Sequence, residues 1–200
     1  MIAKRLFDLF FSLAGTILLL PVFVVVAVWI KFDSKGPVFF RQERVGQFGA
    51  RFCIFKFRTM CLDAEARGRQ ITVGKDPRIT NCGKFLRQHK LDELPQLLNV
   101  ISGDMSLVGP RPEVPRYVAL YPADVRERVL SVPPGITDYA SIEYKDENEI
   151  LGRAADPDKA YIEDIIPIKL AYYQRYVAQR SIWVDVKLIL VTLSAIFGRR

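Results

Sequence analysis

The feature that most constrains this chain is a long uncharged run near its N-terminus. Residues 9–30 contain no Asp, Glu, Lys or Arg, a run of 22 residues. A straight helix of that length would cover roughly 33 Å, enough to cross the hydrocarbon core of a bilayer. A cleaved signal peptide is the alternative, but the run is long, Pro21 interrupts it and no small-residue cleavage site precedes Lys31. The run therefore indicates a membrane segment.

The flanks of this segment favour a particular topology. Lys4 and Arg5 precede the run, and Lys31 and Lys35 follow it. Basic flanks stay in the cytoplasm, so a helix that crossed the bilayer would leave one of these pairs on the wrong side. Pro21 costs about 3 kcal/mol in an ordinary helix interior, because it removes a backbone donor. We therefore expect a re-entrant helix-break-helix, with a simple span as the alternative.

The composition of the chain excludes several classes of protein and of site. The 200 residues allow one domain or two at most, and a hydrophobic fraction of 50% excludes disorder of the whole chain. The net charge of +7 favours anionic partners, and residues 31–90, directly after the membrane segment, hold 14 Lys/Arg against 5 Asp/Glu. A single histidine, His89, excludes sites that need several imidazoles. Three cysteines without CxxC spacing indicate a reducing compartment and no structural zinc.

The rest of the chain predicts an α+β fold that is mainly helical with one small β-hairpin. Residues 38–57 are rich in aromatic and β-branched residues on both sides of a turn marked by Gly46 and Gly49. Strand alternation would place Lys56 and Arg58 on one face of the second strand, where two cations could hold a phosphate; a solvated edge is the alternative. We expect a re-entrant membrane helix in residues 1–35 and a cytoplasmic domain with a C-terminal interfacial helix in residues 36–200; the motifs described below make this the catalytic domain.

Two further segments have helical patterns. Thr80 can cap a helix that runs to about Lys90. Residues 182–197 form the last apolar stretch, which is short for a membrane span and has a mostly polar stripe that contains Asp185. This pattern suits an amphipathic helix on the membrane surface, although an ordinary core helix fits equally well.

Among the side chains that could take part in a reaction, the adjacent acids Asp92 and Glu93 give the clearest indication of a site. Asp92 is a good N-cap for a following amphipathic helix, and Pro95 is tolerated in its first turn, so a cap with a solvated glutamate is one interpretation. The functional interpretation is that two carboxylates at a helix N-terminus hold Mg²⁺ and present a nucleophile, while nearby arginines hold a phosphate.

Four long motifs resemble the bacterial sugar transferase family, the small monotopic polyprenyl-phosphate phosphoglycosyl transferases. They are FFRQERVG at 39–46, FKFRTM at 55–60, LDELPQLLNV at 91–100 and GDMSLVGPRP at 103–112. The resemblance covers nearly the whole chain. It implies a re-entrant membrane helix that enters and leaves on the cytoplasmic face, with its break at Pro21. Larger members carry an N-terminal multi-span region, so the resemblance implies that this chain is the minimal form.

The resemblance also assigns roles to the site residues. It implies that Asp92 is the nucleophile and that Glu93, with Asp92, holds Mg²⁺. The basic residues expected near the phosphates are Lys56, Arg58, Arg87 and Arg111.

The implied reaction moves a sugar-1-phosphate from a UDP-sugar to polyprenyl (undecaprenyl) phosphate, releases UMP and passes through a phospho-sugar on the aspartate. It would be the first membrane step of a glycoconjugate pathway, on the cytoplasmic face of the bacterial inner membrane. The expected partners are UDP-sugar, polyprenyl phosphate and membrane lipid, with a homodimer left open. The sugar and the pathway are not specified.

Two other function classes compete with this one. A non-catalytic membrane-anchored protein that binds anionic lipid would explain the basic block and the apolar run, but not the acid pair beside that block. Nucleic-acid binding is disfavoured, because the aromatic residues cluster with apolar runs instead of alternating with basic residues.

Overall fold

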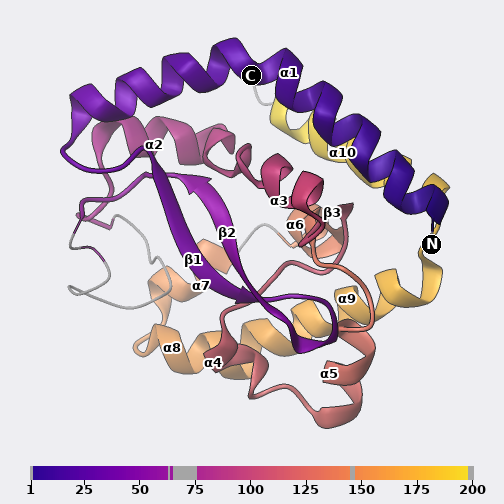
Figure 1. Ribbon diagram of the computed structural model, residues 1–200. Helices are drawn as coiled ribbons and strands as arrows, with labels where there is room; N and C mark the ends of the chain where they lie inside the picture. The colour runs from indigo at the N-terminus through magenta and orange to yellow at the C-terminus, as the bar shows by residue number, and fades with distance from the viewer. Residues whose placement is uncertain (1, 63, 65–75, 145–146, 198–200) are drawn as a thin grey trace.

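A computed structural model describes residues 2–62, 64, 76–144 and 147–197, and within them the chain is mostly helical with two very small sheets (Figure 1). The α-helices are α1 (Ile2–Asp33), α2 (Asn81–Gln88), α3 (Gln96–Ser102), α4 (Pro115–Val118), α5 (Ala123–Val129), α6 (Tyr139–Glu143), α7 (Glu147–Arg153), α8 (Pro157–Ala160), α9 (Ile166–Gln179) and α10 (Ile182–Phe197). The strands are β1 (Phe39–Val45), β2 (Arg51–Phe57), β3 (Ser106–Val108) and β4 (Gly135–Thr137), and three short turns complete the order: η1 (Gln47–Gly49), η2 (Leu91–Glu93) and η3 (Tyr161–Ile165). The mainly helical fold predicted from the sequence is confirmed.

Helix α1 holds the apolar run and continues as one helix through Pro21, so the break expected at this residue is not present. Figure 1 shows that its axis changes direction between its two ends, and proline is the residue type that most often bends a helix. Its apolar side chains, such as Leu18 and Val25, point mostly to the outside, whereas a core helix would bury them. By length and composition α1 is the one helix in the described chain that could cross a membrane.

The predicted hairpin is confirmed. Strands β1 and β2 pair antiparallel from Phe39 opposite Phe57 to Val45 opposite Arg51, and η1 makes the turn. A second, parallel pair joins β3 to β4, which the sequence did not predict. Gly109 and Gly135 follow or begin these strands, and their backbones touch so closely that no side chain would fit between them.

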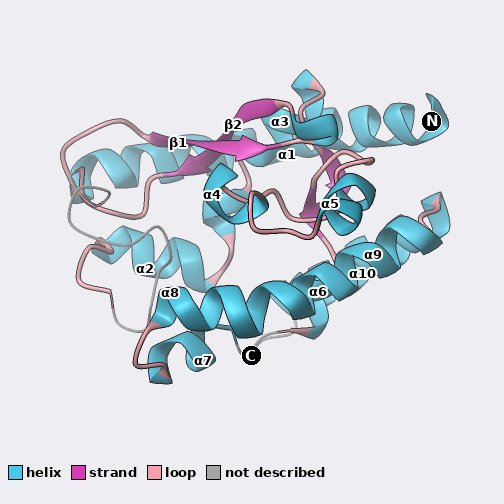
Figure 2. Ribbon diagram, turned by 90° about the horizontal axis from the view of Figure 1, so that it is seen from below, coloured by secondary structure: helices cyan, strands magenta, loops and turns pink. Residues whose placement is uncertain are grey.

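The elements form two sides around the hairpin. Figure 1 shows α1 along one edge of the molecule and α9 along the opposite edge, with β1 and β2 between them; Figure 2 shows α6, α8 and α9 on the side away from the hairpin. The largest core cluster lies around α9 and contains Tyr117, Ile165, Leu170 and Tyr173. A second cluster joins α1 to the hairpin and α2 and contains Phe23, Val26, Ile30, Phe57, Cys82 and Leu86.

Helix α10 packs on the domain with its polar stripe and exposes apolar side chains on its other face. Asp185 and Leu188 are buried against the domain, whereas Trp183 and Leu190 are exposed. Lys4 at the start of α1 pairs with Asp185, with 2.7 Å between Nζ and Oδ2, so the polar stripe docks on the fold and leaves an apolar face outside.

Candidate active site

The acid pair lies in a tight turn between two helices. Helix α2 ends at Gln88, Lys90 takes a left-handed conformation with φ 54°, and the 3₁₀ turn η2 then carries Asp92 and Glu93. A left-handed lysine costs about 1–2 kcal/mol, so the surrounding contacts must hold this reversal of the chain.

The prediction that Asp92 caps a helix was wrong. Helix α3 begins only at Gln96, with Pro95 in the cap position. A cap at Asp92 would bond the backbone N–H groups two and three residues further on. Pro95 has no N–H, and the N–H of Leu94 already donates to the carbonyl of Leu91 at 3.2 Å. The Asp92 carboxylate is therefore not used for capping.

The turn is anchored on an apolar cluster. Leu91 and Leu94, which flank the acid pair, are half-buried and pack against the cluster that joins α1, β2 and α2. Burial of apolar surface stabilises such a contact in proportion to the area removed from water. The two leucines thereby hold the acid turn against this cluster.

Glu93 is surrounded by two of the predicted basic residues. Lys56 Nζ lies 2.7 Å from Glu93 Oε1, and the Arg111 guanidinium donates to both carboxylate oxygens, at 3.1 Å to Oε2. Burial alone would raise the pKa of Glu93, but Arg111 and Lys56 outweigh it and hold that pKa well below its ordinary value. Glu93 is therefore ionised and fixed in place.

Asp92 has the opposite environment. No hydrogen bond or ion pair reaches its carboxylate from the residues that the structure describes. Burial raises its pKa and the neighbouring Glu93 carboxylate raises it further, while Lys56, Arg87 and Arg111 oppose the rise. The result is a half-buried carboxylate near three cations with its lone pairs available for chemistry.

Arg87 belongs to the same region, and Arg58 does not. Arg87 in α2 donates from Nε to Thr59 Oγ1 at 2.9 Å, and its charge acts on Asp92. Arg58 is buried and donates to the carbonyls of Ser34 at 2.7 Å and of Lys35, just beyond the C-terminal end of α1. Arg58 lies one residue beyond the end of β2 at Phe57, and its guanidinium binds the end of α1.

Sequence reasoning missed the residues that hold Arg111. The Asp138 carboxylate accepts from the Arg111 backbone N–H at 3.3 Å, and Arg44 donates to the carbonyl of Pro112 at 3.1 Å. Asp138 is itself fixed by a capping box with Ser141 at the start of α6. The Asp-x-x-Ser spacing at 138–141 was the available signal.

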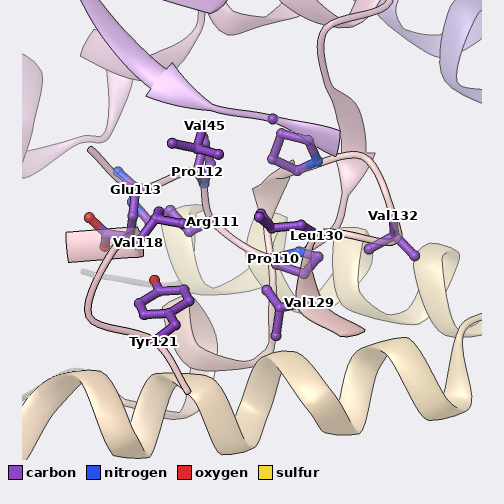
Figure 3. A pocket seen from close by; sticks show the side chains of 12 residues that line it. Val45, Pro110, Arg111, Pro112, Glu113, Val118, Tyr121, Val129, Leu130 and Val132 are labelled. Carbon is purple, nitrogen blue, oxygen red and sulfur yellow. The ribbon is translucent and has the colours of Figure 1, made fainter. Parts of the chain in front are cut away.

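A small pocket is lined by Arg111 and lies between the end of β1 and residues 110–113 (Figure 3). Its lining is mostly apolar, with Arg111 and Glu113 as the charged groups. The Glu113 carboxylate accepts from the Tyr161 hydroxyl at 2.5 Å and pairs with Arg44 at 3.5 Å and Lys169 at 3.8 Å. The pocket therefore adjoins a second buried ion cluster.

The acid pair could supply only part of a metal site. Among the described residues, no group of three or more His, Cys, Asp or Glu side chains is arranged to hold a metal ion. Mg²⁺ commonly uses one or two carboxylates together with substrate phosphates, so a two-carboxylate donor set is compatible with it.

Comparison with known proteins identifies the family. The bacterial sugar transferase family matches residues 1–199. Similar proteins include a UDP-N-acetylgalactosamine-undecaprenyl-phosphate N-acetylgalactosaminephosphotransferase of Aeromonas hydrophila, 37% identical over 98% of this chain and 45% of that protein. An undecaprenyl-phosphate glucose phosphotransferase of Komagataeibacter xylinus is 38% identical over 100% of this chain and 37% of that protein. The chain thus spans less than half the length of these relatives. With a match over almost every residue, it belongs to the bacterial sugar transferase family.

Proposed function

We propose that this chain transfers a sugar-1-phosphate from a UDP-sugar to polyprenyl phosphate and releases UMP. The family match and the names of the relatives support this class of reaction. The observation that carries the proposal is the contrast within the acid pair: Glu93 is bound by Lys56 and Arg111, and Asp92 beside it takes no bond from the described residues.

In the first step Asp92 acts as the nucleophile. One of its carboxylate oxygens bonds to the β-phosphorus of the UDP-sugar, and the bond from that phosphorus to the bridging oxygen breaks. UMP leaves with the electron pair, and the sugar phosphate remains on Asp92 as an acyl phosphate. Lys56, Arg87 and Arg111 supply positive charge near Asp92, which favours its ionised form and the negative charge of the diphosphate.

In the second step the acceptor takes the sugar phosphate. A phosphate oxygen of polyprenyl phosphate attacks the same phosphorus, and the bond to Asp92 breaks, which restores the carboxylate. One phosphoric anhydride is lost and one is formed, so no further energy source is needed. The role of Glu93 is to fix Lys56 and Arg111 beside the reacting group.

We also propose that the reaction uses Mg²⁺. A carboxylate has about four lone-pair sites, and the three donations from Lys56 and Arg111 leave one site on Glu93 Oε2. The residues therefore fit an ion held by Glu93 and Asp92 together with substrate phosphate oxygens. When bound, Mg²⁺ would neutralise charge on the leaving phosphate.

The membrane placement completes the proposal. We infer that α1 is re-entrant, with Pro21 at the bend and both ends on the cytoplasmic face of the inner membrane. The basic residues at both flanks and the bend of α1 in Figure 1 support this topology. Labelling of Lys4 and Lys35 from each side of sealed vesicles tests it: labelling of both from one side is expected, and labelling from opposite sides contradicts the re-entrant topology.

The test of the reaction is UMP release. Purified protein in detergent is given Mg²⁺, undecaprenyl phosphate and each UDP-sugar of a panel in turn. We expect UMP and a lipid-linked sugar product with at least one sugar, and loss of both when EDTA is added. The rival function, a non-catalytic protein that binds anionic lipid, predicts vesicle binding without UMP from any member of the panel.

A further inference from the structure

Three aromatic rings form a row between the membrane helix and the acid turn. The ring of Trp29 in α1 lies 5.2 Å, centroid to centroid, from that of Phe85 in α2, and Phe85 lies 4.2 Å from His89. The His89 ring is held in place by a 2.9 Å contact from Nδ1 to the carbonyl of Phe85. We call Trp29, Phe85 and His89 the aromatic row.

The row is exposed although its members touch one another. Trp29 is 40% exposed and Phe85 is 42% exposed, and His89 lies at the surface. Cys82 and Leu86 are the fully buried α2 residues in the cluster that α2 shares with α1. Packing between the two helices therefore does not explain why a large apolar side chain stands at the exposed position 85. Each ring therefore keeps a face that the described residues do not cover.

The aromatic row lies between the exposed apolar surface of α1 and the segment that carries Asp92. At one end, Trp29 continues the exposed apolar surface of α1, where Val25 is 65% and Phe32 is 88% exposed. At the other end, His89 lies three residues before Asp92.

The positive charges near the row favour a ligand with an anionic group. Helix α2 has no acidic residue and carries Lys84 and Arg87, and the charge of Arg87 acts on Asp92. An apolar track that leads from a membrane helix to a group of cations is complementary to an amphiphile with an apolar tail and an anionic head.

We propose that the aromatic row binds the isoprenoid tail of the acceptor next to its phosphate. The proposal rests on the proposed function, which makes a polyprenyl phosphate the acceptor. Aromatic rings offer a large, rigid apolar face, which suits a methyl-branched, unsaturated chain. The row would guide the end of the tail out of the lipid and place the phosphate beside Asp92.

The test compares acceptors of different tail length. Trp29→Leu and Phe85→Leu remove a ring and keep an apolar side chain. Trp183→Leu is the matched control, since Trp183 is 84% exposed and lies two residues before Asp185, which pairs with Lys4 at the end of α1 opposite Trp29. The KM for undecaprenyl phosphate, for the short geranyl phosphate and for the UDP-sugar is measured in one detergent. We expect the two row variants to raise the KM for undecaprenyl phosphate about five- to tenfold, with the Trp29→Leu effect lost for geranyl phosphate. The KM for the UDP-sugar should not change.

The contrary outcomes are separable. If both row variants have an unchanged KM for undecaprenyl phosphate while the unmodified protein turns over normally, the aromatic row does not bind the tail. The proposed function is then unaffected. An equal rise in Trp183→Leu also overturns the role of the row, because general contact with lipid or detergent would then be the cause. Absence of UMP release by the unmodified protein would overturn the proposed function and the row together.

Discussion

Half-buried Glu93 and buried Glu113 have similar surroundings and differ in one respect. Glu93 pairs with Lys56 and Arg111, and Glu113 pairs with Arg44 and Lys169. At Glu113 the remaining contact is filled by the Tyr161 hydroxyl. At Glu93 the neighbour is a second carboxylate, Asp92, which has no bond from the described residues.

The pKa shifts of these carboxylates also separate the two glutamates from Asp92. Burial works against both glutamates, and their cations outweigh it, so the pKa of each is lowered. For Asp92 the balance is reversed, because burial and Glu93 raise the pKa more than the cations lower it. Under the proposed function, the closed ion cluster around Glu113 stabilises the fold, whereas the cluster around Glu93 positions the Asp92 carboxylate for the reaction.

The largest expected effect comes from Asp92→Asn. Removal of the nucleophile should lower UMP release at least about a thousandfold, without loss of vesicle binding. Because the pKa of Asp92 is higher in the fold than in the unfolded chain, its charged form disfavours folding near neutral pH. The amide should therefore unfold at the same temperature as the unmodified protein or at a higher one. Substantial turnover in this variant would remove Asp92 from the nucleophile role.

Glu113→Gln should lower the free energy of unfolding without acting on the acid pair directly. The amide removes the buried carboxylate that pairs with Arg44, whereas Lys169 keeps its 2.8 Å pair with Glu147, and loss of one partner from such a cluster costs about 3 kcal/mol. Denaturant unfolding in detergent measures this change. Glu43→Gln is the control, since its pair with Arg51 is exposed and should contribute less than about 1 kcal/mol. Equal losses in the two variants would contradict the distinction between the sites.

Arg111→Lys should have a smaller effect on catalysis than the loss of Asp92. Lysine keeps the charge but cannot donate to both oxygens of Glu93, so we expect UMP release to fall about ten- to a hundredfold. Arg116→Lys is the matched control: its contact with Asp158 is 3.7 Å long and largely exposed. A similar loss in the control would show that charge at the surface, and not the fork on Glu93, is responsible.

The smallest expected effect is a shift in pH dependence. Asp92 must be ionised to attack, so the rate of the first step should rise with pH through a midpoint above the ordinary aspartate value of 3.8. Glu93→Gln removes the negative charge that raises this pKa, while the amide oxygen can still accept a hydrogen bond from Lys56 or Arg111 and keep positive charge near Asp92. The midpoint of single-turnover UMP release should then move to lower pH. A move to higher pH would contradict the assignment of Asp92 as the titrating group.

Much of the fold could be predicted from the sequence, because its signals are local. Alternating aromatic and β-branched residues around Gly46 and Gly49 indicated the hairpin, and the cap at Thr80 indicated α2. The parallel pair of β3 and β4 was not predictable in this way. Each of these strands has three residues, and they are brought together by the close approach of Gly109 and Gly135.

The site shows the same limit. Sequence reasoning identified Asp92 and Glu93 by their types and neighbours, but it placed them at a helix cap that Pro95 cannot support. It also paired Arg58 with Lys56, although the carbonyls at the end of α1 bind the guanidinium of Arg58. Such contacts join segments that are far apart in the sequence, so they depend on the packing of the whole chain.

The central claim is that Asp92, whose carboxylate takes no bond from the described residues, becomes the covalent carrier of the sugar phosphate. Protein mixed with Mg²⁺ and its UDP-sugar, without acceptor, should release about one UMP per chain in a single burst. Mass spectrometry of the quenched protein should then find the sugar phosphate on the peptide that contains Asp92. A protein that turns over with acceptor present, yet shows neither the burst nor the adduct without it, would contradict the account.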